Sequence, residues 1–441
     1  MKTAALALLL PSVAFAQSCE PQWDPNFTIL TGGLSNRVGA LAVADLGQGP
    51  RLIAAGNFTS PSPLSRVAAW DGQSWSALGA GPTSISCLTT FDDGTGRKLY
   101  AGTGGAVFIF NGSSWSTLGS YAGMCSTLIE FDLDGPGPQP PSLIAAGSSV
   151  ATNSVVSRWN GTAWENLANA PTPGSNAVGY ALAVHDADGP GPAAPALYLA
   201  GHTLNAQRCV VMKLEGDAWI PQVTAPSFFG DATTFATLDT PSGPALHVAG
   251  NFDFGRLAIH RLTATGWENA LAVTGPQIGA PFPSDVSHSW MVPILDQDGP
   301  ALALFPPGLT NALLLRNGTL TPWGIGINQQ TTLPVFVLPV QDAQGSSLFI
   351  GGVFASVTAS GGETTSNNIA RLRLCERITS CSPDFNQDGD FGTDQDIEAF
   401  FACLAGNCCQ RCLSSDFNND GDSGTDQDIE AFFRVLAGGS C

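Results

Sequence analysis

The side chains best suited to chemistry lie in a short acidic segment that occurs twice near the end of the chain. The first copy starts at Asp384 and the second at Asp416, an offset of 416 − 384 = 32 residues. Oxygen-bearing side chains occupy alternate positions in each copy, and a glycine that permits a sharp turn follows them. Ca²⁺ takes such oxygens from short loops, so two calcium sites are predicted. The predicted ligands are Asp384, Asn386, Asp388 and the carbonyl of Asp390 in the first loop, and Asp416, Asn418, Asp420 and Asp422 in the second.

The residue that closes each loop departs from the spacing of an EF-hand. An EF-hand has an acidic residue at the twelfth loop position, whereas the first loop has Gln395 there, one residue before Asp396. Asp396 and Asp428 are therefore the predicted closing ligands. The same two aspartates also lie three residues after Thr393 and Thr425, a spacing typical of a helix capping box. A capping role thus competes with the ligand role.

A helix is predicted after each loop. Apolar residues recur at spacing i, i+3, i+4 and i+7, which gives each helix one apolar stripe. The two stripes are expected to pack face to face. They consist of Ile397, Phe400, Phe401 and Leu404 in the first helix, and of Ile429, Phe432, Phe433 and Leu436 in the second.

The acidic segment resembles a dockerin module, with one residue added before the closing aspartate. The resemblance covers residues 381–441 and implies a small α-helical domain with a pair of F-hand loops. It also implies a cohesin-like or other cell-surface protein as partner. Ordinary dockerins lack the six cysteines found here, which are expected to form disulfides of undetermined pairing in an oxidising compartment. They are Cys381, Cys403, Cys408, Cys409, Cys412 and Cys441.

The start of the chain predicts export. Met1-Lys2, an apolar run over residues 4–10 and Ala14-Phe-Ala16 have the pattern of a secretory signal that is cleaved before Gln17. No later stretch reaches the roughly 18 apolar residues of a membrane-spanning helix. We therefore expect a secreted or cell-surface protein without a membrane span. The net charge of −19, with no basic patch, argues against nucleic acid as a partner.

Residues 17–376 contain a repeat. Tryptophans recur at intervals of 40 to 56 residues, and the first three follow an Asp-Gly or Asn-Gly pair, a strong hairpin signal. A strand that ends in Ala-Gly precedes most of them. Each unit predicts four strands in about 40 to 50 residues, which is typical of a propeller blade. The tryptophans are expected to pack between blades, and they are Trp75, Trp115, Trp164, Trp219, Trp267 and Trp323.

The repeats predict an all-β, seven-bladed propeller. The sixth unit is degenerate, because Phe305-Pro306 replaces Ala-Gly, so six blades is the alternative if this unit is an insertion. The seventh unit lacks its tryptophan strand. Its three predicted strands cover Val335–Val340, Leu348–Phe354 and Ile369–Leu374.

The missing strand is predicted at the other end of the chain. The segment from Trp23 to Gly33 looks like a fourth strand without a blade, and it can complete the seventh blade, so that no sheet edge is left open. Cys19 and Cys375 would then lie close together. We expect them to form a disulfide that closes the ring.

The repeat resembles that of secreted bacterial β-propellers with W-[DN]-G-x-x-W units, broadly kelch-like in spacing. The repeated residues fix turns and packing rather than chemistry. No Ser-His-Asp order, HExxH motif or Gly-rich phosphate loop occurs, so no catalytic residue is predicted. Asp-x-Asp-Gly recurs at Asp132, Asp186 and Asp296, where plain turns are expected rather than cation loops.

The predicted domains are a signal peptide over residues 1–16, a propeller over 17–376 and a calcium-binding domain over 377–441. The leading hypothesis is an exported, non-enzymatic binding or display protein. Its propeller would bind a glycan or a protein, and its dockerin-like end would anchor it to a surface partner. The alternative is a propeller polysaccharide lyase or glycoside hydrolase delivered through that end. Acidic or histidine side chains clustered at one mouth of the propeller would favour the enzyme.

Overall fold

The structure is a computed structural model of the 441-residue chain. It describes residues 21–24, 27, 33–135, 137–149, 154–168, 177–189, 191–203, 208–222, 230–240, 243–252, 256–263, 266–271, 290–296, 299–329, 335–342, 345–359, 362–374, 382–386, 392–409, 412, 415–418 and 424–437.

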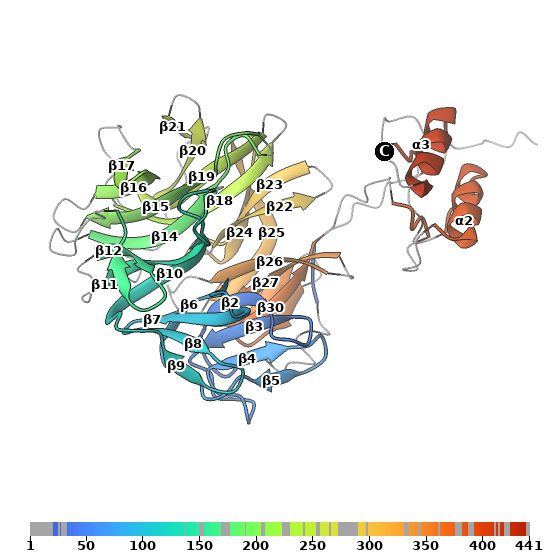
Figure 1. The fold of residues 1–441 in the computed structure, drawn as a ribbon. Helices are drawn as coiled ribbons and strands as arrows, with labels where there is room; N and C mark the ends of the chain where they lie inside the picture. Colours follow the sequence, from blue (N-terminus) through green and yellow to red (C-terminus); the bar gives the residue numbers. More distant parts are fainter. Residues whose placement is uncertain are drawn as a thin grey trace, which may run out of the picture.

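Seven antiparallel sheets follow one another around a ring (Figure 1). This arrangement confirms the predicted seven-bladed propeller. Blades 1 to 5 are meanders of four strands each, in chain order. Blade 1 consists of β2 (Val38–Asp45), β3 (Pro50–Gly56), β4 (Val67–Trp70) and β5 (Trp75–Ala77). Blade 2 consists of β6 (Ile85–Asp92), β7 (Arg97–Thr103), β8 (Val107–Phe110) and β9 (Trp115–Thr117). Blade 3 consists of β10 (Gly123–Phe131), β11 (Ser142–Ser149), β12 (Ser154–Trp159) and β13 (Trp164–Asn166).

The other blades complete the ring. Blade 4 consists of β14 (Ala177–His185), β15 (Ala196–Thr203), β16 (Arg208–Glu215) and β17 (Ala218–Pro221). Blade 5 consists of β18 (Gly230–Thr240), β19 (Gly243–Phe252), β20 (Arg256–Thr263) and β21 (Gly266–Asn269). Blade 6 consists of β22 (Met291–Asp296), β23 (Gly299–Leu304), β24 (Asn311–Arg316), β25 (Thr319–Gln329), β28 (Phe354–Ala359) and β29 (Gly362–Thr365). Blade 7 consists of β26 (Phe336–Asp342), β27 (Gly345–Gly351), β30 (Ile369–Arg373) and β1 (Gln22–Trp23).

A β-bulge explains the repeated Ala-Gly. In blades 1 to 5 the innermost strand carries one extra residue close to the glycine of the Ala-Gly pair in the second strand. In four of them the bulge moves a backbone carbonyl into the place of a side chain. A Cβ on Gly56 would lie 2.1 Å from the Arg37 carbonyl oxygen, and one on Gly250 would lie 1.9 Å from that of Asp231. Only glycine fits there.

Blade 6 lacks both the bulge and the glycine. The register of β22 and β23 runs without a shift from Met291 to Asp296, and the N–H of Phe305 donates to the Trp290 carbonyl over 2.8 Å. A regular ladder leaves room for a side chain at this point, which is why Phe305-Pro306 can replace Ala-Gly. The degenerate unit is therefore a complete blade and not an insertion.

The hairpin of β28 and β29 differs from the sequence prediction. Residues Leu348–Phe354 were predicted as one strand of blade 7, but β27 ends at Gly351, and Phe354 begins β28. That hairpin leaves blade 7 and pairs with β25 of blade 6, where Ile327 lies opposite Val357. Its pairing partner lies in a neighbouring blade, so no short-range sequence signal marks it.

The predicted closure of the ring is confirmed, but the closing strand is not the predicted segment from Trp23 to Gly33, because β1 ends at Trp23 and Phe27 is helical. In β1, Trp23 pairs with Leu372 of β30, and its indole N–H donates to the Thr358 carbonyl over 2.8 Å. Asp24 is buried beside it. Its Oδ2 lies 2.8 Å from Arg373 Nη2 and 3.7 Å from Arg371 Nη1, so a buried carboxylate joins the two ends of the propeller.

Cys19 and Cys375, the pair predicted to form the closing disulfide, lie outside the described residues.

The recurrent tryptophans join neighbouring blades. The indole N–H of Trp115 donates to the Leu78 carbonyl over 2.8 Å, and that of Trp164 donates to the Leu118 carbonyl over 2.7 Å. Trp219 repeats the contact with Leu167 over 3.1 Å. In each case the acceptor follows the outer strand of the preceding blade. These contacts agree with the expected packing between blades.

Two short helices form the C-terminal domain: α2 (Asp394–Leu404) and α3 (Asp426–Leu436). Their interface contains four phenylalanines with no exposed surface, two from the helices and two from the loops before them. The rings of Phe400 and Phe432 stack with centroids 4.1 Å apart, and Phe385 and Phe417 pack edge-on against them. The expected face-to-face packing is confirmed. Among the described residues, no helix has the length and hydropathy needed to cross a bilayer.

Candidate calcium centre

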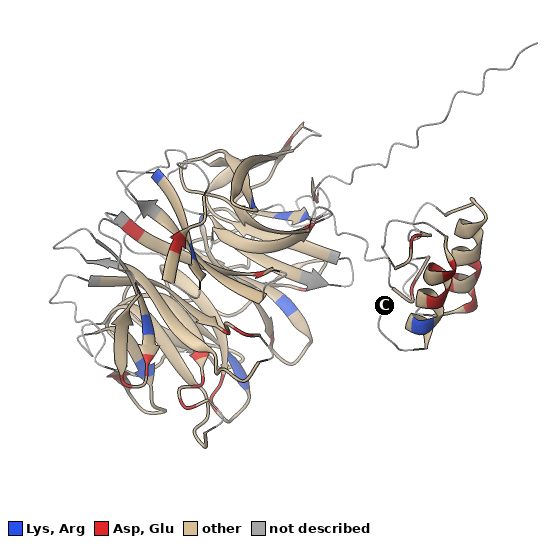
Figure 2. Cartoon of the chain, turned by 90° about the horizontal axis from the view of Figure 1, so that it is seen from above, with Lys and Arg blue, Asp and Glu red and all other residues tan. Residues whose placement is uncertain are grey.

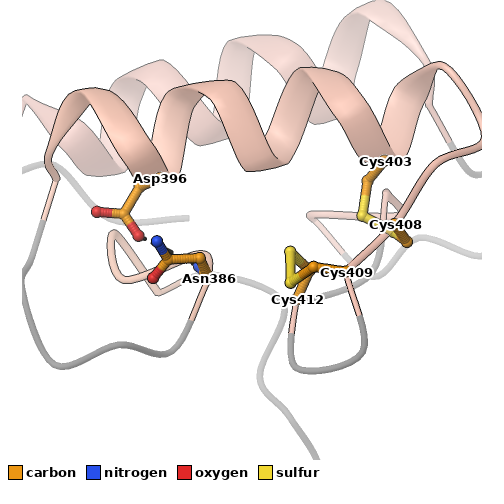
Figure 3. The surroundings of a disulfide bond; sticks show 6 residues. All are labelled: Asn386, Asp396, Cys403, Cys408, Cys409 and Cys412. Carbon is orange, nitrogen blue, oxygen red and sulfur yellow. Dashed lines mark hydrogen bonds between the residues drawn. A yellow bond between two sulfur atoms is a disulfide. The ribbon is translucent and has the colours of Figure 1, made fainter.

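Asp396 links the start of the first loop to the start of α2. Its Oδ1 accepts from the backbone N–H of Asn386 over 3.2 Å (Figure 3). Its Oδ2 accepts from the N–H of Thr393 over 2.8 Å and from the hydroxyl of Thr393 over 2.9 Å. The side chain has no exposed surface. The predicted N-cap at Thr393 is confirmed, and the capping carboxylate also ties down the loop.

Asp428 repeats this arrangement in the second loop. Its Oδ1 accepts from the N–H of Phe417 over 2.7 Å and from that of Asn418 over 3.2 Å. Its Oδ2 accepts from the N–H and the hydroxyl of Thr425, both over 2.8 Å. A carboxylate offers about four lone-pair positions, and four donors point at this one. The structure thus shows the capping role of Asp428, while its role as a closing ligand stays a prediction.

The hydrogen bonds change the ionisation of Asp428. Burial alone would raise the pKa of this carboxyl, because it disfavours the charged form. The hydrogen bonds from Thr425, Asn418 and Phe417 outweigh burial and hold the pKa below its ordinary value of 3.8. Asp428 is therefore ionised at neutral pH, which is the form that a calcium ligand requires.

Six of the ten predicted ligands lie among the described residues. The first and third positions of each loop are described, and the loops bring them to the ends of the two helices. Among the described residues, no three His, Cys, Asp or Glu side chains cluster closely enough to hold a metal. Four predicted ligands lie outside those residues: Asp388, Asp390, Asp420 and Asp422. The donor set is made of oxygen alone, which fits Ca²⁺ rather than zinc.

One disulfide holds the other end of α2, and a second lies in the segment that follows the helix. Cys403 in the last turn of the helix bonds to Cys408, and Cys409 bonds to Cys412 (Figure 3). Four of the six cysteines are thus confirmed as disulfide-bonded, and their pairing is local. Cys381 and Cys441 lie outside the described residues.

An apolar patch on the helices was missed by the sequence analysis. Phe401 and Phe433 were assigned to the packed stripes, but each is 44% exposed, and their ring centroids lie 6.2 Å apart. A helix turns by about 100° per residue, so the second phenylalanine of each pair points away from the core. We call Phe401 and Phe433 the phenylalanine pair.

One acidic side chain on each helix lies a turn before the phenylalanine pair. Glu398 and Glu430 lie three residues before Phe401 and Phe433 and are exposed. Figure 2 shows acidic residues along both helices. Arg434 is the single cation in the part of this domain that the structure describes, and it pairs with Glu430 at 3.4 Å. The patch is therefore apolar at its centre and acidic at its rim.

The acidic turns of the propeller bind their own backbone. Asp132 Oδ1 accepts from the N–H of Asp134, and Asp134 Oδ2 accepts from that of Gln139 over 3.1 Å. Asp186 and Asp188 repeat this pattern. Such bonds are those of an ordinary turn, as expected.

The third acidic turn is different. There Asp296 pairs with Arg316 on β24, whose Nη2 lies 2.7 Å from both carboxylate oxygens. This carboxylate joins two strands of blade 6 rather than stabilising its own turn.

Two of the described histidines of the propeller are buried, and His260 on β20 is half-buried. His185 and His247 are buried, on β14 and β19 of adjacent blades. Burial lowers the pKa of both rings, and that of His247 falls to about 4. Both are therefore neutral at neutral pH and are enclosed by protein.

The solved structures that are similar to this chain share little sequence identity with it. A GH74 xyloglucanase from Xanthomonas campestris is 16% identical, with a TM-score of 0.44, and the match covers 68% of this chain and 46% of that one. This chain thus spans less than half of the xyloglucanase. AofleA from Arthrobotrys oligospora is 11% identical, with a TM-score of 0.41, over 66% of this chain and 88% of that one.

A mutant of Aleuria aurantia lectin in complex with alpha-methyl-L-fucoside is 15% identical to this chain. Its TM-score is 0.35, and the match covers 66% of this chain and 95% of that one. No protein-family profile matches the chain, and no curated protein sequence resembles it significantly.

Proposed function

We propose that this is an exported binding or display protein. Its propeller binds a glycan, and its C-terminal domain binds two Ca²⁺ ions and anchors the protein to a partner at the cell surface, in the manner of a dockerin. The observation that carries this proposal is the phenylalanine pair. Two large apolar side chains remain exposed at equivalent positions of a duplicated unit, although the same small domain buries four other phenylalanines.

The acidic rim indicates the chemistry of the partner. A surface that covers Phe401 and Phe433 must be apolar at its centre. Positive side chains around that centre would complement Glu398 and Glu430. The partner is therefore expected to present a basic rim around an apolar pocket, as a cohesin-like or other surface protein could.

Calcium acts as a folding element in this proposal. Asp384, Asn386, Asp388 and Asp390 hold the ion in the first loop, and Asp416, Asn418, Asp420 and Asp422 hold it in the second. Bound Ca²⁺ would neutralise the loop carboxylates and so fix the loops against the helices. Asp396 and Asp428 hold the ends of the loops together, because their oxygens already accept from backbone N–H groups.

Calcium binding is tested on the full chain by calorimetric titration. Two sites are expected, and Asp384→Ala with Asp416→Ala should abolish both. The matched control is Asp394→Ala with Asp426→Ala, because these exposed helix carboxylates lie beside the loops and are not predicted ligands. Unchanged binding in the loop variant would refute the ligand assignment.

Anchoring is tested with envelope fragments of the producing cells. The full-length protein should bind them in calcium and dissociate when a chelator is added. Phe401→Ser with Phe433→Ser should weaken binding by at least about tenfold, because the loss of one buried aromatic anchor commonly exceeds 1.4 kcal/mol. Wild-type binding by this variant would exclude the phenylalanine pair as the docking surface.

A further inference from the structure

We propose that the groove between blades 2 and 3 is the binding site for an uncharged oligosaccharide, with Trp159 as its platform. This inference rests on the proposed glycan-binding function and assigns it to a place. The groove has a volume of about 630 Å³, within the range of about 300 to 1,000 Å³ of small-molecule sites.

Three loops form the groove at one face of the propeller. The turn between β6 and β7 contributes Asp92 and Asp93, and the turn between β10 and β11 contributes Asp134. The end of β12, where the hairpin to β13 begins, contributes Arg158 and Trp159. In an antiparallel blade the first and third turns lie at the same end, so the fold gathers these residues from two blades.

Trp159 differs from its aromatic counterparts in blades 1 and 2. Trp70 and Phe110 hold the same position opposite the recurrent tryptophan, and they are only 6% and 4% exposed. Trp159 is half-buried and lines the groove. The packing of the blades does not require a partly exposed indole at this position. Such an indole can stack on the apolar face of a sugar.

The Trp159 ring is held firmly by its neighbours. It packs against Trp164 with centroids 5.6 Å apart. It also lies over Gly119, where a Cβ would come within 2.5 Å of the ring. A platform that is already fixed loses little conformational entropy when a ligand binds.

The polar groups of the groove are also held in place. Glu165 accepts from Arg158 through Nε over 2.7 Å and through Nη2. Asp134 accepts from the N–H of Gln139. A fixed guanidinium and a fixed carboxylate beside an aromatic ring offer a donor and an acceptor to sugar hydroxyls. This combination of one ring and a few fixed polar groups is typical of a specific ligand site.

The charge of the lining excludes acidic ligands. Three carboxylates line the groove, against the single guanidinium of Arg158. Lys98 pairs with Asp93 and Glu165 pairs with Arg158, so Asp92 and Asp134 leave the lining negative. A sulfated or uronic acid sugar would be repelled. The site therefore fits a neutral oligosaccharide.

The test is a glycan array followed by calorimetry with the strongest neutral ligand, using the full-length protein. Trp159→Ala should weaken binding by more than about tenfold, and Asp134→Asn by a smaller factor. Leu214→Ala is the matched control, because Leu214 holds the same strand position in blade 4 and is also half-buried. Its affinity should equal that of the wild type.

Trp159→Phe keeps a ring in place and should cost only a few-fold, which makes the proposal testable even if Trp159→Ala fails to fold. If the wild type binds a neutral glycan and the Trp159 and Asp134 variants bind it equally well, the groove is excluded and the glycan-binding function stands. If binding is confined to acidic glycans, the assignment to this groove fails. If no glycan binds, both the groove and the glycan-binding function fail.

Discussion

The propeller and the C-terminal domain are stabilised by different interactions. Seven blades bury a large apolar core between sheets, and their charged side chains mostly form turns and surface pairs. The two helices bury a small group built on four phenylalanines. A core of that size supplies little stabilisation, so two buried carboxylates and two disulfides support it. The size of the core thus decides where charge and covalent bonds are used.

Two carboxylates among the described residues of the propeller are buried as well: Asp296, which pairs with Arg316, and Asp24 at the closure of the ring. Asp24 is a buried carboxylate that bonds to residues almost 350 positions away, much as Asp396 and Asp428 bond across their loops. In both regions, therefore, a buried carboxylate joins two segments of the chain.

The largest expected effect comes from Asp24. Asp24→Ala leaves Arg371 buried without its carboxylate, which should lower the free energy of unfolding by about 3 to 5 kcal/mol. Asp45→Ala is the control, because Asp45 is exposed and bonds only to its own turn. Tryptophan fluorescence in denaturant checks this, since all ten tryptophans lie before residue 324. A loss no greater than that of the control would show that apolar pairing alone closes the ring.

The folding stability of the propeller and that of the C-terminal domain should depend differently on pH. The unfolded chain protonates His247 near its ordinary pKa of 6.5, and the folded propeller does so only at about 4. The propeller should therefore lose about 1 kcal/mol per pH unit as the pH falls through this window. The Asp428 carboxyl has a pKa below 3.8 in the folded domain, so its contribution is lost only below that pH.

Measurement of the two regions in parallel would check this difference. Tryptophan fluorescence follows the propeller, and the helical circular dichroism signal follows the C-terminal domain. His247→Gln should flatten the dependence of the propeller between pH 6.5 and 4. If both regions lose stability over the same window, the histidine explanation is wrong.

The Asp428→Asn variant distinguishes the capping role of Asp428 from its predicted role as a calcium ligand. An amide cannot accept four hydrogen bonds, so the variant should destabilise the C-terminal domain by about 1 to 3 kcal/mol even when a chelator removes calcium. Asp426→Asn, at an exposed position of the same turn, is the control. Normal stability in chelator combined with weaker calcium binding would instead make Asp428 a ligand.

The smallest expected effect concerns a single indole bond. Trp115→Phe removes the N–H that donates to Leu78 and should cost about 1 kcal/mol, because the carbonyl also loses its partner. Trp75 holds the equivalent position, but its buried N–H has no partner in the structure. Trp75→Phe should therefore be neutral. Equal losses in both variants would show that ring volume, rather than the hydrogen bond, joins the blades.

Much of the fold could be predicted from the sequence because its signals are local and repeated. Asp-Gly and Asn-Gly turns, the Ala-Gly strand ends and the unpaired Trp23 strand led to seven blades and a closed ring. The capping boxes were predicted from a three-residue spacing. The β28–β29 hairpin was not predictable, since it pairs with a strand in another blade.

The candidate sites also differ in how much of each could be predicted from the sequence. The proposed calcium loops rest on residue type and spacing alone, because all their predicted ligands lie within a few positions of one another. The exposure of Phe401 and Phe433 depends on how two helices pack, and the groove at Trp159 depends on three loops from two blades. The order of residues thus specifies turns, caps and ligand types, which are short-range. Which side chains stay uncovered is decided by contacts between distant segments, and those exist only in the folded molecule.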